Sequence, residues 1–177
     1  VYCLDKEKQS LVWKYPTNDA LVAVPVIYNG MVCTGASDGI FRAIHLADGQ
    51  LIWQFQPVNS FVDTRPLVYQ EKVIFGAWDG HMYALNLLDG SLAWKWQGER
   101  TSPLYSPAAC WPVGTEGKVF FAAPDRFLTA VDAQKGETVW RNNNWKFRET
   151  VGISGDGRLV FARSMTDSVI AASTSSG

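Results

Sequence analysis

The chain has 177 residues, of which 47% are hydrophobic and 19% charged, with a formal net charge of −1. This composition is ample for a packed core, and the length is that of one domain, occasionally two. The near-neutral charge argues against nucleic-acid binding, which needs a basic stripe. No apolar run of roughly 18 residues occurs, so we expect no transmembrane helix.

The chain begins at Val1 inside a strand-like pattern, with no initiator methionine and no signal peptide. We therefore expect it to be a piece of a longer protein. Its three cysteines, Cys3, Cys33 and Cys110, lack the spacing of a metal site. Two interpretations of them stay open: buried free thiols, or one disulfide with a third thiol left over.

Short β-type runs, bounded by turn residues, follow one another along the chain. The first four are Val22–Tyr28, Met31–Gly35, Ile40–His45 and Leu51–Phe55, and the next four are Phe61–Tyr69, Lys72–Gly76, His81–Asn86 and Leu92–Gln97. No stretch of ten or more residues combines helical periodicity with helix caps. The pattern predicts an all-β fold made of four-stranded units.

Several landmarks recur in one register. Tryptophan returns at Trp13, Trp53, Trp94 and Trp140. A turn pair stands at Asp38-Gly39, Asp79-Gly80, Asp125-Arg126 and Asp167-Ser168, and a proline at Pro25, Pro66 and Pro107, with Gly152 in that place in the last copy. Asp-Gly between apolar runs predicts type I′ turns, and proline suits the start of a strand. A period of about 40 residues is typical of a repeat array.

The repeats divide the chain into radially stacked sheets, the blades of a β-propeller. Residues 1–15 form the last two strands of a blade, and residues 16–55 and 56–97 form one blade each. Residues 98–141 form a blade with an insertion at 109–117, and residues 142–177 form an incomplete blade. We expect this piece to belong to a ring of seven or eight blades, although closure of the piece on itself stays open.

The most regular landmark is the stretch Ala130–Trp140, which has the pattern Ala-x-Asp-x-x-x-Gly-x-x-x-Trp. Each tryptophan is expected to fill the gap between neighbouring blades, which is worth roughly 2–4 kcal/mol. The glycine four residues earlier (Gly49, Gly90 and Gly136) is expected in a turn with positive φ. Asp132, like Asp5 in the first copy, is expected to accept bonds from the loop amides.

This pattern resembles the tryptophan-docking motif of quinoprotein-like propellers, known as PQQ repeats, over essentially the whole chain. The family includes quinoprotein alcohol dehydrogenases, outer-membrane assembly factors resembling BamB, and propellers fused to kinases or calcineurin-like phosphoesterases. The stretch from Phe147 to Asp167 looks most similar to the phosphoesterase-linked propellers. The resemblance alone favours a bacterial periplasm or cell envelope as the location.

Few residues fit a catalytic site or a cofactor site. Trp145, Trp78 and Trp111 offer stacking surfaces for a quinone, and Arg65, Arg148 and Arg100 offer partners for its carboxylates, but the adjacent cysteines of the dehydrogenase site are missing. His45 and His81 lack metal spacing, and no nucleophile-elbow sequence occurs. We therefore expect no cofactor, no metal and no enzymatic activity.

The residues that vary between the repeats are the candidates for function. Those before the repeated proline should lie at the mouth of the innermost strand, near the propeller axis, and Trp111 lies in the insertion. The candidate ligand or partner surface comprises Asp63, Arg65, Tyr105, Trp111, Arg148 and Glu149. The alternatives are a hydrated ion-pair network across the channel and a loop at Trp111 that covers a strand edge.

Three functions follow from these observations. The first is a non-enzymatic scaffold that binds a protein partner or a fused domain. The second is a recognition propeller of a larger enzyme, such as a phosphoesterase or a kinase, and the third is a fragment of a quinoprotein dehydrogenase. A small molecule in the channel stays possible for any of them. We favour the first, because of the type of repeat and because no catalytic constellation occurs in the sequence.

Overall fold

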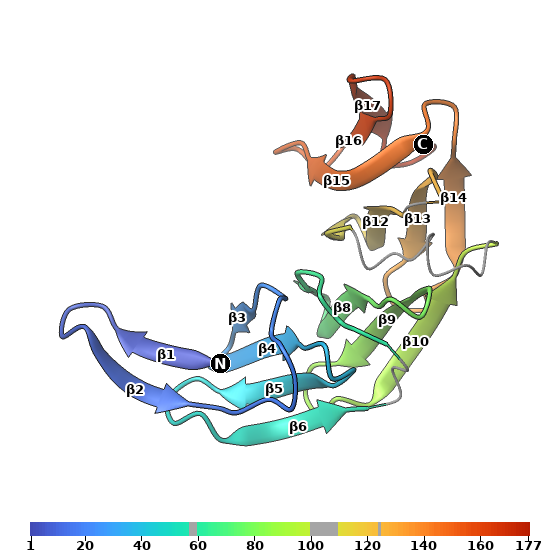
Figure 1. The fold of residues 1–177 in the computed structure, drawn as a ribbon. Coiled ribbons are helices and arrows are strands. Elements are labelled where there is room, and N and C mark those ends of the chain that lie inside the picture. The colour runs from blue at the N-terminus through green and yellow to red at the C-terminus, as the bar shows by residue number, and fades with distance from the viewer. Residues whose placement is uncertain (57–59, 100–109, 124) are drawn as a thin grey trace.

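The computed structural model of the chain is an open arc of antiparallel sheets (Figure 1). It describes residues 1–56, 60–99, 110–123 and 125–177, apart from the side chains of residues 149 and 150. Within these residues no helix is long and apolar enough to cross a membrane. The sheets repeat radially, as in a β-propeller, so the predicted all-β fold is confirmed.

The arc contains four groups of strands beyond its N-terminal hairpin. The hairpin is β1 (Tyr2–Asp5) and β2 (Ser10–Lys14). The next two groups are β3 (Val26–Tyr28), β4 (Met31–Gly35), β5 (Phe41–His45), β6 (Leu51–Phe55), and β7 (Leu67–Tyr69), β8 (Lys72–Gly76), β9 (His81–Asn86), β10 (Leu92–Gln97). The last two are β11 (Val113–Thr115), β12 (Lys118–Ala122), β13 (Leu128–Asp132), β14 (Thr138–Asn142), and β15 (Phe147–Ile153), β16 (Leu159–Ser164), β17 (Val169–Ser173).

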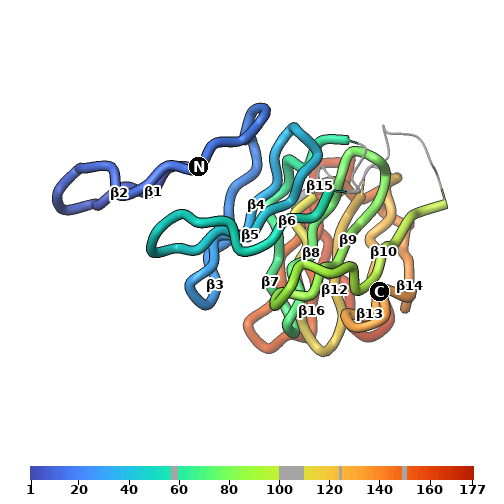
Figure 2. The backbone as a smooth tube through the Cα atoms, turned by 90° about the horizontal axis from the view of Figure 1, so that it is seen from below, coloured from blue at the N-terminus to red at the C-terminus, as the bar shows by residue number. Residues whose placement is uncertain are grey.

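Within each group, every strand pairs with the next one along the chain. The strands β6, β10 and β14 lie on the convex side of the arc, and the short first strands face its concave side (Figure 1). The hairpin β1–β2 forms one end of the arc (Figure 2). The groups β11–β14 and β15–β17 are joined into one sheet, because β12 also pairs with β15 at Ala122 and Glu149.

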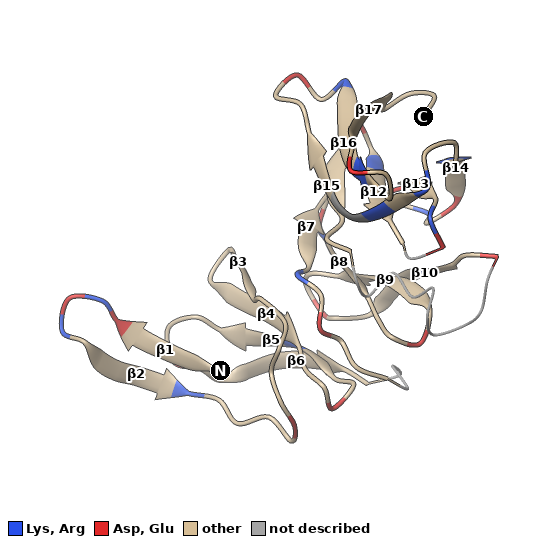
Figure 3. Ribbon diagram, turned by 45° about the horizontal axis from the view of Figure 1, so that its top comes forward, with Lys and Arg blue, Asp and Glu red and all other residues tan. Residues whose placement is uncertain are grey.

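The core lies between neighbouring sheets, because successive strand residues point to opposite faces. Val73 and Phe75 of β8 pack against the preceding sheet, and Ile74 between them packs against the following one. The rings of Phe41 and Phe75 stack across the first of these interfaces at 4.0 Å between centroids. Many of the charged residues lie at turns and loops (Figure 3). The buried residues are mostly hydrophobic, with a few polar or charged exceptions such as Arg42 and Lys72.

Each repeated tryptophan packs on a glycine of the next sheet. A Cβ atom built on Gly49 would lie 2.7 Å from the Trp13 ring, and one on Gly90 would lie 2.5 Å from Trp53. The Trp94 ring covers Gly136 in the same way. Each indole N–H also donates to the carbonyl three residues before that glycine, as in the bond of 2.8 Å from Trp13 to Leu46. The contact thus fixes both the distance and the register between sheets.

A further copy of this contact stands at the C-terminal end of the chain. The Trp140 ring covers Gly177, and its indole donates to the carbonyl of Thr174 at 3.3 Å. Ser173 takes the place of the turn aspartate and accepts a bond from the Ser175 amide. This copy was not predicted from the sequence, although Gly177 follows Trp140 by the same 37 residues that separate Gly90 from Trp53. The other copies were found by their tryptophans, and no tryptophan follows Gly177 in this sequence.

The turn aspartates bond as expected, but the Asp-Gly turns are not of type I′. The Asp132 carboxylate accepts the amides of Gln134 and Lys135, and Asp5 accepts two amides likewise. In the Asp38-Gly39 turn, only Gly39 has positive φ. The Asp38 carboxylate accepts the Ile40 amide instead, which holds the aspartate outside the left-handed region. The prediction of type I′ turns at these pairs was therefore wrong.

The turns with two consecutive positive φ values connect the first and second strands of the groups. They are Asn29-Gly30, Gln70-Glu71 and Glu116-Gly117. Each links two strands directly, as a type I′ hairpin requires. The I′ geometry thus occurs one turn earlier in the repeat than predicted.

The first strands are shorter than predicted. They begin at Val26 and Leu67, directly after Pro25 and Pro66, whereas the predicted runs began at Val22 and Phe61. The residues before proline find no ladder partner, since proline lacks an amide donor and restricts the residue before it. In the third repeat, β11 follows Pro112 rather than Pro107, inside the stretch predicted as an insertion.

None of the three cysteines forms a disulfide, so the disulfide alternative is excluded. Cys33 and Cys110 are fully buried and Cys3 is half-buried. Burial raises the pKa of the Cys33 thiol to about 11. Burial, with a contribution from the Asp125 charge, raises the pKa of Cys110 to about 12. Both groups behave as packing residues, because a buried thiol resists ionisation.

Candidate functional site

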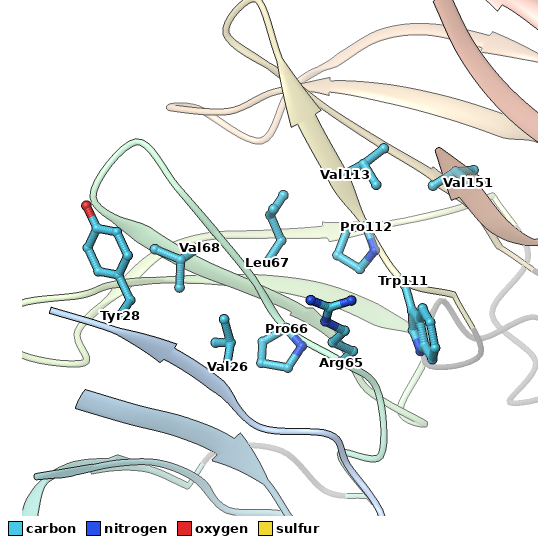
Figure 4. Close-up of a pocket in the computed structure, with 10 residues that line it drawn as sticks. All are labelled: Val26, Tyr28, Arg65, Pro66, Leu67, Val68, Trp111, Pro112, Val113 and Val151. Atoms are coloured by element: carbon cyan, nitrogen blue, oxygen red, sulfur yellow. The ribbon is translucent and has the colours of Figure 1, made fainter. Parts of the chain in front are cut away.

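A concave site of about 360 Å³ lies on the inner wall of the arc, where four strand groups meet. Its lining combines a cation, an indole, a phenol and an apolar wall. The residues are Val26, Tyr28, Arg65, Pro66, Leu67, Val68, Trp111, Pro112, Val113 and Val151. They come from β3, β7, β11 and β15 and from the residues just before β7 and β11 (Figure 4). We call this the inner-wall site.

Arg65 and Trp111 meet at one side of the inner-wall site. The Arg65 guanidinium carbon lies 6.0 Å from the centroid of the Trp111 ring, within the range of a cation–π contact. Both residues directly precede the proline that starts a first strand, so they hold equivalent places in two neighbouring repeats. Arg65 is exposed and Trp111 is 47% exposed. The pair thus presents a charge and an aromatic surface to a ligand.

A buried hydrogen bond places these two side chains next to each other. The Thr64 hydroxyl donates to the carbonyl of Cys110 at 2.6 Å, and both residues are buried. Thr64 directly precedes Arg65, and Cys110 directly precedes Trp111. This bond therefore joins the two segments that carry the site residues. Val62 anchors the first segment: it is buried over Gly35 of the preceding sheet, where a Cβ atom would lie 2.3 Å from its side chain.

The other candidate residues lie elsewhere. Asp63 lines a separate cavity with Ser60, Phe61 and Trp78, and within the described residues it forms no ion pair with Arg65. Arg148 is exposed on β15, whose Val151 lines the inner-wall site. Tyr105 lies outside the described residues, and of Glu149 only the backbone is described. The structure therefore joins Arg65 with Trp111 and separates them from Asp63.

The residues considered for a quinone are dispersed. Trp111 and Arg65 line the inner-wall site, Trp78 lines the Asp63 cavity, and Trp145 is 52% exposed on the turn before β15. Arg100 lies outside the described residues. In the described part of the chain, no three His, Cys, Asp or Glu side chains gather in a way that would hold a metal ion. The three described tryptophans of this set thus lie in three different places rather than around one pocket.

The apolar residues of the inner-wall site were not predicted from the sequence. Tyr28 and Val68 are ordinary strand residues in the sequence, and Val113 was assigned to an insertion. The useful signal was the proline before each first strand, because the residues after it line the concave side of the arc. Assigning Pro112 instead of Pro107 as the third such proline would have placed Trp111 next to Arg65.

Comparison with known proteins identifies relatives of the fold. A family model described as outer membrane protein assembly factor BamB matches residues 1–100, 52–123 and 124–177. No curated protein sequence gives a significant match. Among solved structures, BamB from Moraxella catarrhalis is 18% identical with a TM-score of 0.74, and the match covers 93% of this chain and 50% of that one.

Two further structures share the fold. The computationally designed Ika4 protein is 17% identical with a TM-score of 0.77, and the match covers 93% of this chain and 98% of the designed one. The quinohemoprotein alcohol dehydrogenase ADHIIG from Pseudomonas putida HK5 is 18% identical with a TM-score of 0.74, over 93% of this chain and 34% of the enzyme. The chain therefore spans half of the BamB structure and about a third of the dehydrogenase.

Proposed function

Because the chain belongs to the family described as outer membrane protein assembly factor BamB, we propose that it is a non-enzymatic propeller module that binds a protein partner. The contact is made at the inner-wall site, with Arg65 and Trp111 as its central residues. The description of the family, which concerns protein assembly, favours a protein partner over a small substrate.

The pairing of Arg65 with Trp111 is the observation that carries this proposal. Arginine and tryptophan are enriched among the residues that dominate binding energy at protein interfaces. Here they lie 6.0 Å apart on an exposed surface, beside an apolar wall. Arg65 offers donors to a carboxylate or carbonyl of the partner, and Trp111 offers a rigid apolar face. The site thus has the two kinds of group, a charged donor and a rigid aromatic surface, that are typical of an interface hot spot.

The chemistry of the described residues also supports a role in recognition rather than catalysis. The two buried thiols have raised pKa values, so neither is prepared as a nucleophile. His45 contacts Asp48 at 3.0 Å on the surface, away from the residues that line the inner-wall site. The cation and the indole of that site are binding groups.

The test begins with the protein that crosslinks to this chain in its own cells and is identified by mass spectrometry. The purified partner is then titrated with wild-type chain and with Arg65→Ala and Trp111→Ala. Each substitution should weaken binding at least about 10-fold, as expected for a hot-spot residue. Both variants should unfold at nearly the wild-type temperature, because the two side chains are exposed.

Matched controls keep the residue type and change the place. Arg158→Ala and Trp145→Ala remove side chains that are 82% and 52% exposed, on turns away from the inner-wall site. They should leave the dissociation constant unchanged. Equal weakening by the control substitutions, or earlier melting of Arg65→Ala and Trp111→Ala without any loss of binding, would contradict the proposal.

A further inference from the structure

A second cavity, of about 490 Å³, is lined by Ser60, Phe61, Asp63 and Trp78. Ser60, Phe61 and Asp63 precede β7, and Trp78 lies in the turn between β8 and β9. The cavity shares no lining residue with the inner-wall site. It combines one carboxylate with two aromatic rings.

Backbone hydrogen bonds fix this combination from two sides. The Trp78 amide donates to the carbonyl of Phe61 at 3.0 Å, which ties the turn to the segment before β7. The Val62 amide donates to the carbonyl of Ala36 in the preceding sheet at 3.2 Å. The backbone at Phe61, Val62 and Trp78 is therefore held by main-chain contacts, which do not depend on the identity of the side chains.

The Asp63 carboxylate keeps most of its capacity to accept hydrogen bonds. The Ser37 hydroxyl donates to it at 3.4 Å, a long bond for two oxygen atoms. Within the described residues, this is its only hydrogen bond, and it takes part in no ion pair there. Asp63 is half-buried, and its carboxylate has acceptor sites left for a cationic ligand.

The preceding repeat shows that the fold does not require these side chains. When the two repeats are aligned on their prolines, Phe61 corresponds to Ala20 and Asp63 to Val22. When they are aligned on their Asp-Gly turns, Trp78 corresponds to Ser37. The backbone bond from Trp78 to Phe61 has its counterpart in a bond of 2.9 Å from Ser37 to Ala20. The same frame thus holds small or aliphatic residues in one repeat and an acid with two aromatic residues in the next.

From this geometry we propose that Phe61, Asp63 and Trp78 form a binding site for an organic cation, namely an alkylammonium or guanidinium group. The Asp63 carboxylate supplies the opposite charge. The faces of Trp78 and Phe61 supply cation–π attraction, which is strongest for tryptophan. Phe61 is 51% exposed, so the entrance is accessible. The site requires neither Arg65 nor Trp111, so it stands or fails independently of the proposed function.

The experiment uses small cations as probes and follows the indole N–H signals by NMR, with the Trp78 signal assigned from Trp78→Leu. Choline, butylammonium and methylguanidinium are titrated separately, and 3,3-dimethylbutan-1-ol serves as the uncharged analogue of choline. At least one cation should shift the Trp78 signal with a dissociation constant on the order of millimolar, and the alcohol should bind at least about 10-fold more weakly. The cation that binds most tightly identifies the preferred group.

Two substitutions decide whether the site is the one proposed. Asp63→Asn keeps the shape of the side chain but removes its charge, and it should weaken cation binding at least about 10-fold. Trp78→Leu should remove cation binding altogether, and Asp156→Asn, at an exposed aspartate elsewhere, should leave it unchanged. Unchanged binding to Asp63→Asn, or equal binding of the alcohol and choline, would overturn the proposal. Because the amide that replaces the carboxylate retains an acceptor for Ser37, the Asp63→Asn variant should unfold at the wild-type temperature.

Discussion

Four glycines that follow third strands of the repeats face a tryptophan ring of the preceding sheet. Two physical demands meet at each of them. The backbone has positive φ, which residues other than glycine adopt at a cost, and the ring leaves no room for a side chain. Other glycines carry only the first demand. Gly30 has a φ of +75°, yet a Cβ atom there would find nothing within 4 Å.

This difference allows the ring contact to be measured separately from the backbone cost. Gly90→Ala should destabilise the chain by about 3 kcal/mol, since it adds overpacking against Trp53 to the strain of positive φ. Gly30→Ala has nearly the same φ without the contact and should cost only about 1 kcal/mol. Chemical denaturation of both variants gives the two free energies. Equal losses would show that the ring contributes nothing beyond backbone conformation.

At the scale of the element, the hairpin turns between first and second strands differ in how well their residues suit them. Asn29-Gly30 and Glu116-Gly117 place glycine at the second position. The middle copy places Gln70 and Glu71 there, with φ of +48° and +60°. The strands β7 and β8 still pair in register, so the ladder and the buried sheet faces outweigh the strain of the turn.

The middle turn therefore offers a stabilising substitution. Glu71→Gly should raise the free energy of unfolding by about 0.5–1 kcal/mol, because glycine adopts positive φ without a steric penalty, although it costs more entropy on folding. The Leu87 amide still finds the carbonyl of residue 71, since that bond uses the backbone. In urea titrations, Glu71→Gly and Gly30→Ala should change the free energy of unfolding in opposite directions. A Glu71→Gly variant that is less stable than the wild type would show that the turn is not strained.

Across the whole molecule, each sheet buries both faces only because its neighbours cover them. Cys33 belongs to one interface between sheets and Cys110 to another, and both side chains are fully inaccessible. Access to either thiol thus requires the sheets to separate. Cys3, in the hairpin at the end of the arc, is half-buried and needs no such opening.

Thiol reactivity should report this separation. At pH 8 a chromogenic disulfide reagent should modify Cys3 rapidly and the other two thiols only as the chain opens, because a thiol with a pKa of about 11 is about one-thousandth ionised there. Full modification is expected in denaturant. Mass spectrometry of the labelled chain assigns the sites. Rapid labelling of Cys33 or Cys110 in the native state would mean that the interfaces between sheets open readily.

Part of the candidate site could be predicted from the repeat pattern, and part could not. Arg65 and Trp111 were both predicted as surface candidates, and the structure brings them together at the inner-wall site. Asp63 was assigned to the same surface as Arg65, but it lines the cavity of Trp78. Both were assigned there because they precede the repeated proline, at the expected mouth of the innermost strand. The strand β7 begins only at Leu67, so position relative to the proline does not by itself decide where the side chains before it point.

The sequence by itself determined the repeated architecture, because strand alternation, turn residues and the spacing of Trp13, Trp53, Trp94 and Trp140 are local properties of the chain. Tertiary structure decided which variable residues meet. The bond between Thr64 and Cys110 joins segments 46 residues apart and sets Arg65 beside Trp111. Such a contact depends on how neighbouring sheets pack, and the packing is a property of the whole arc rather than of any one repeat.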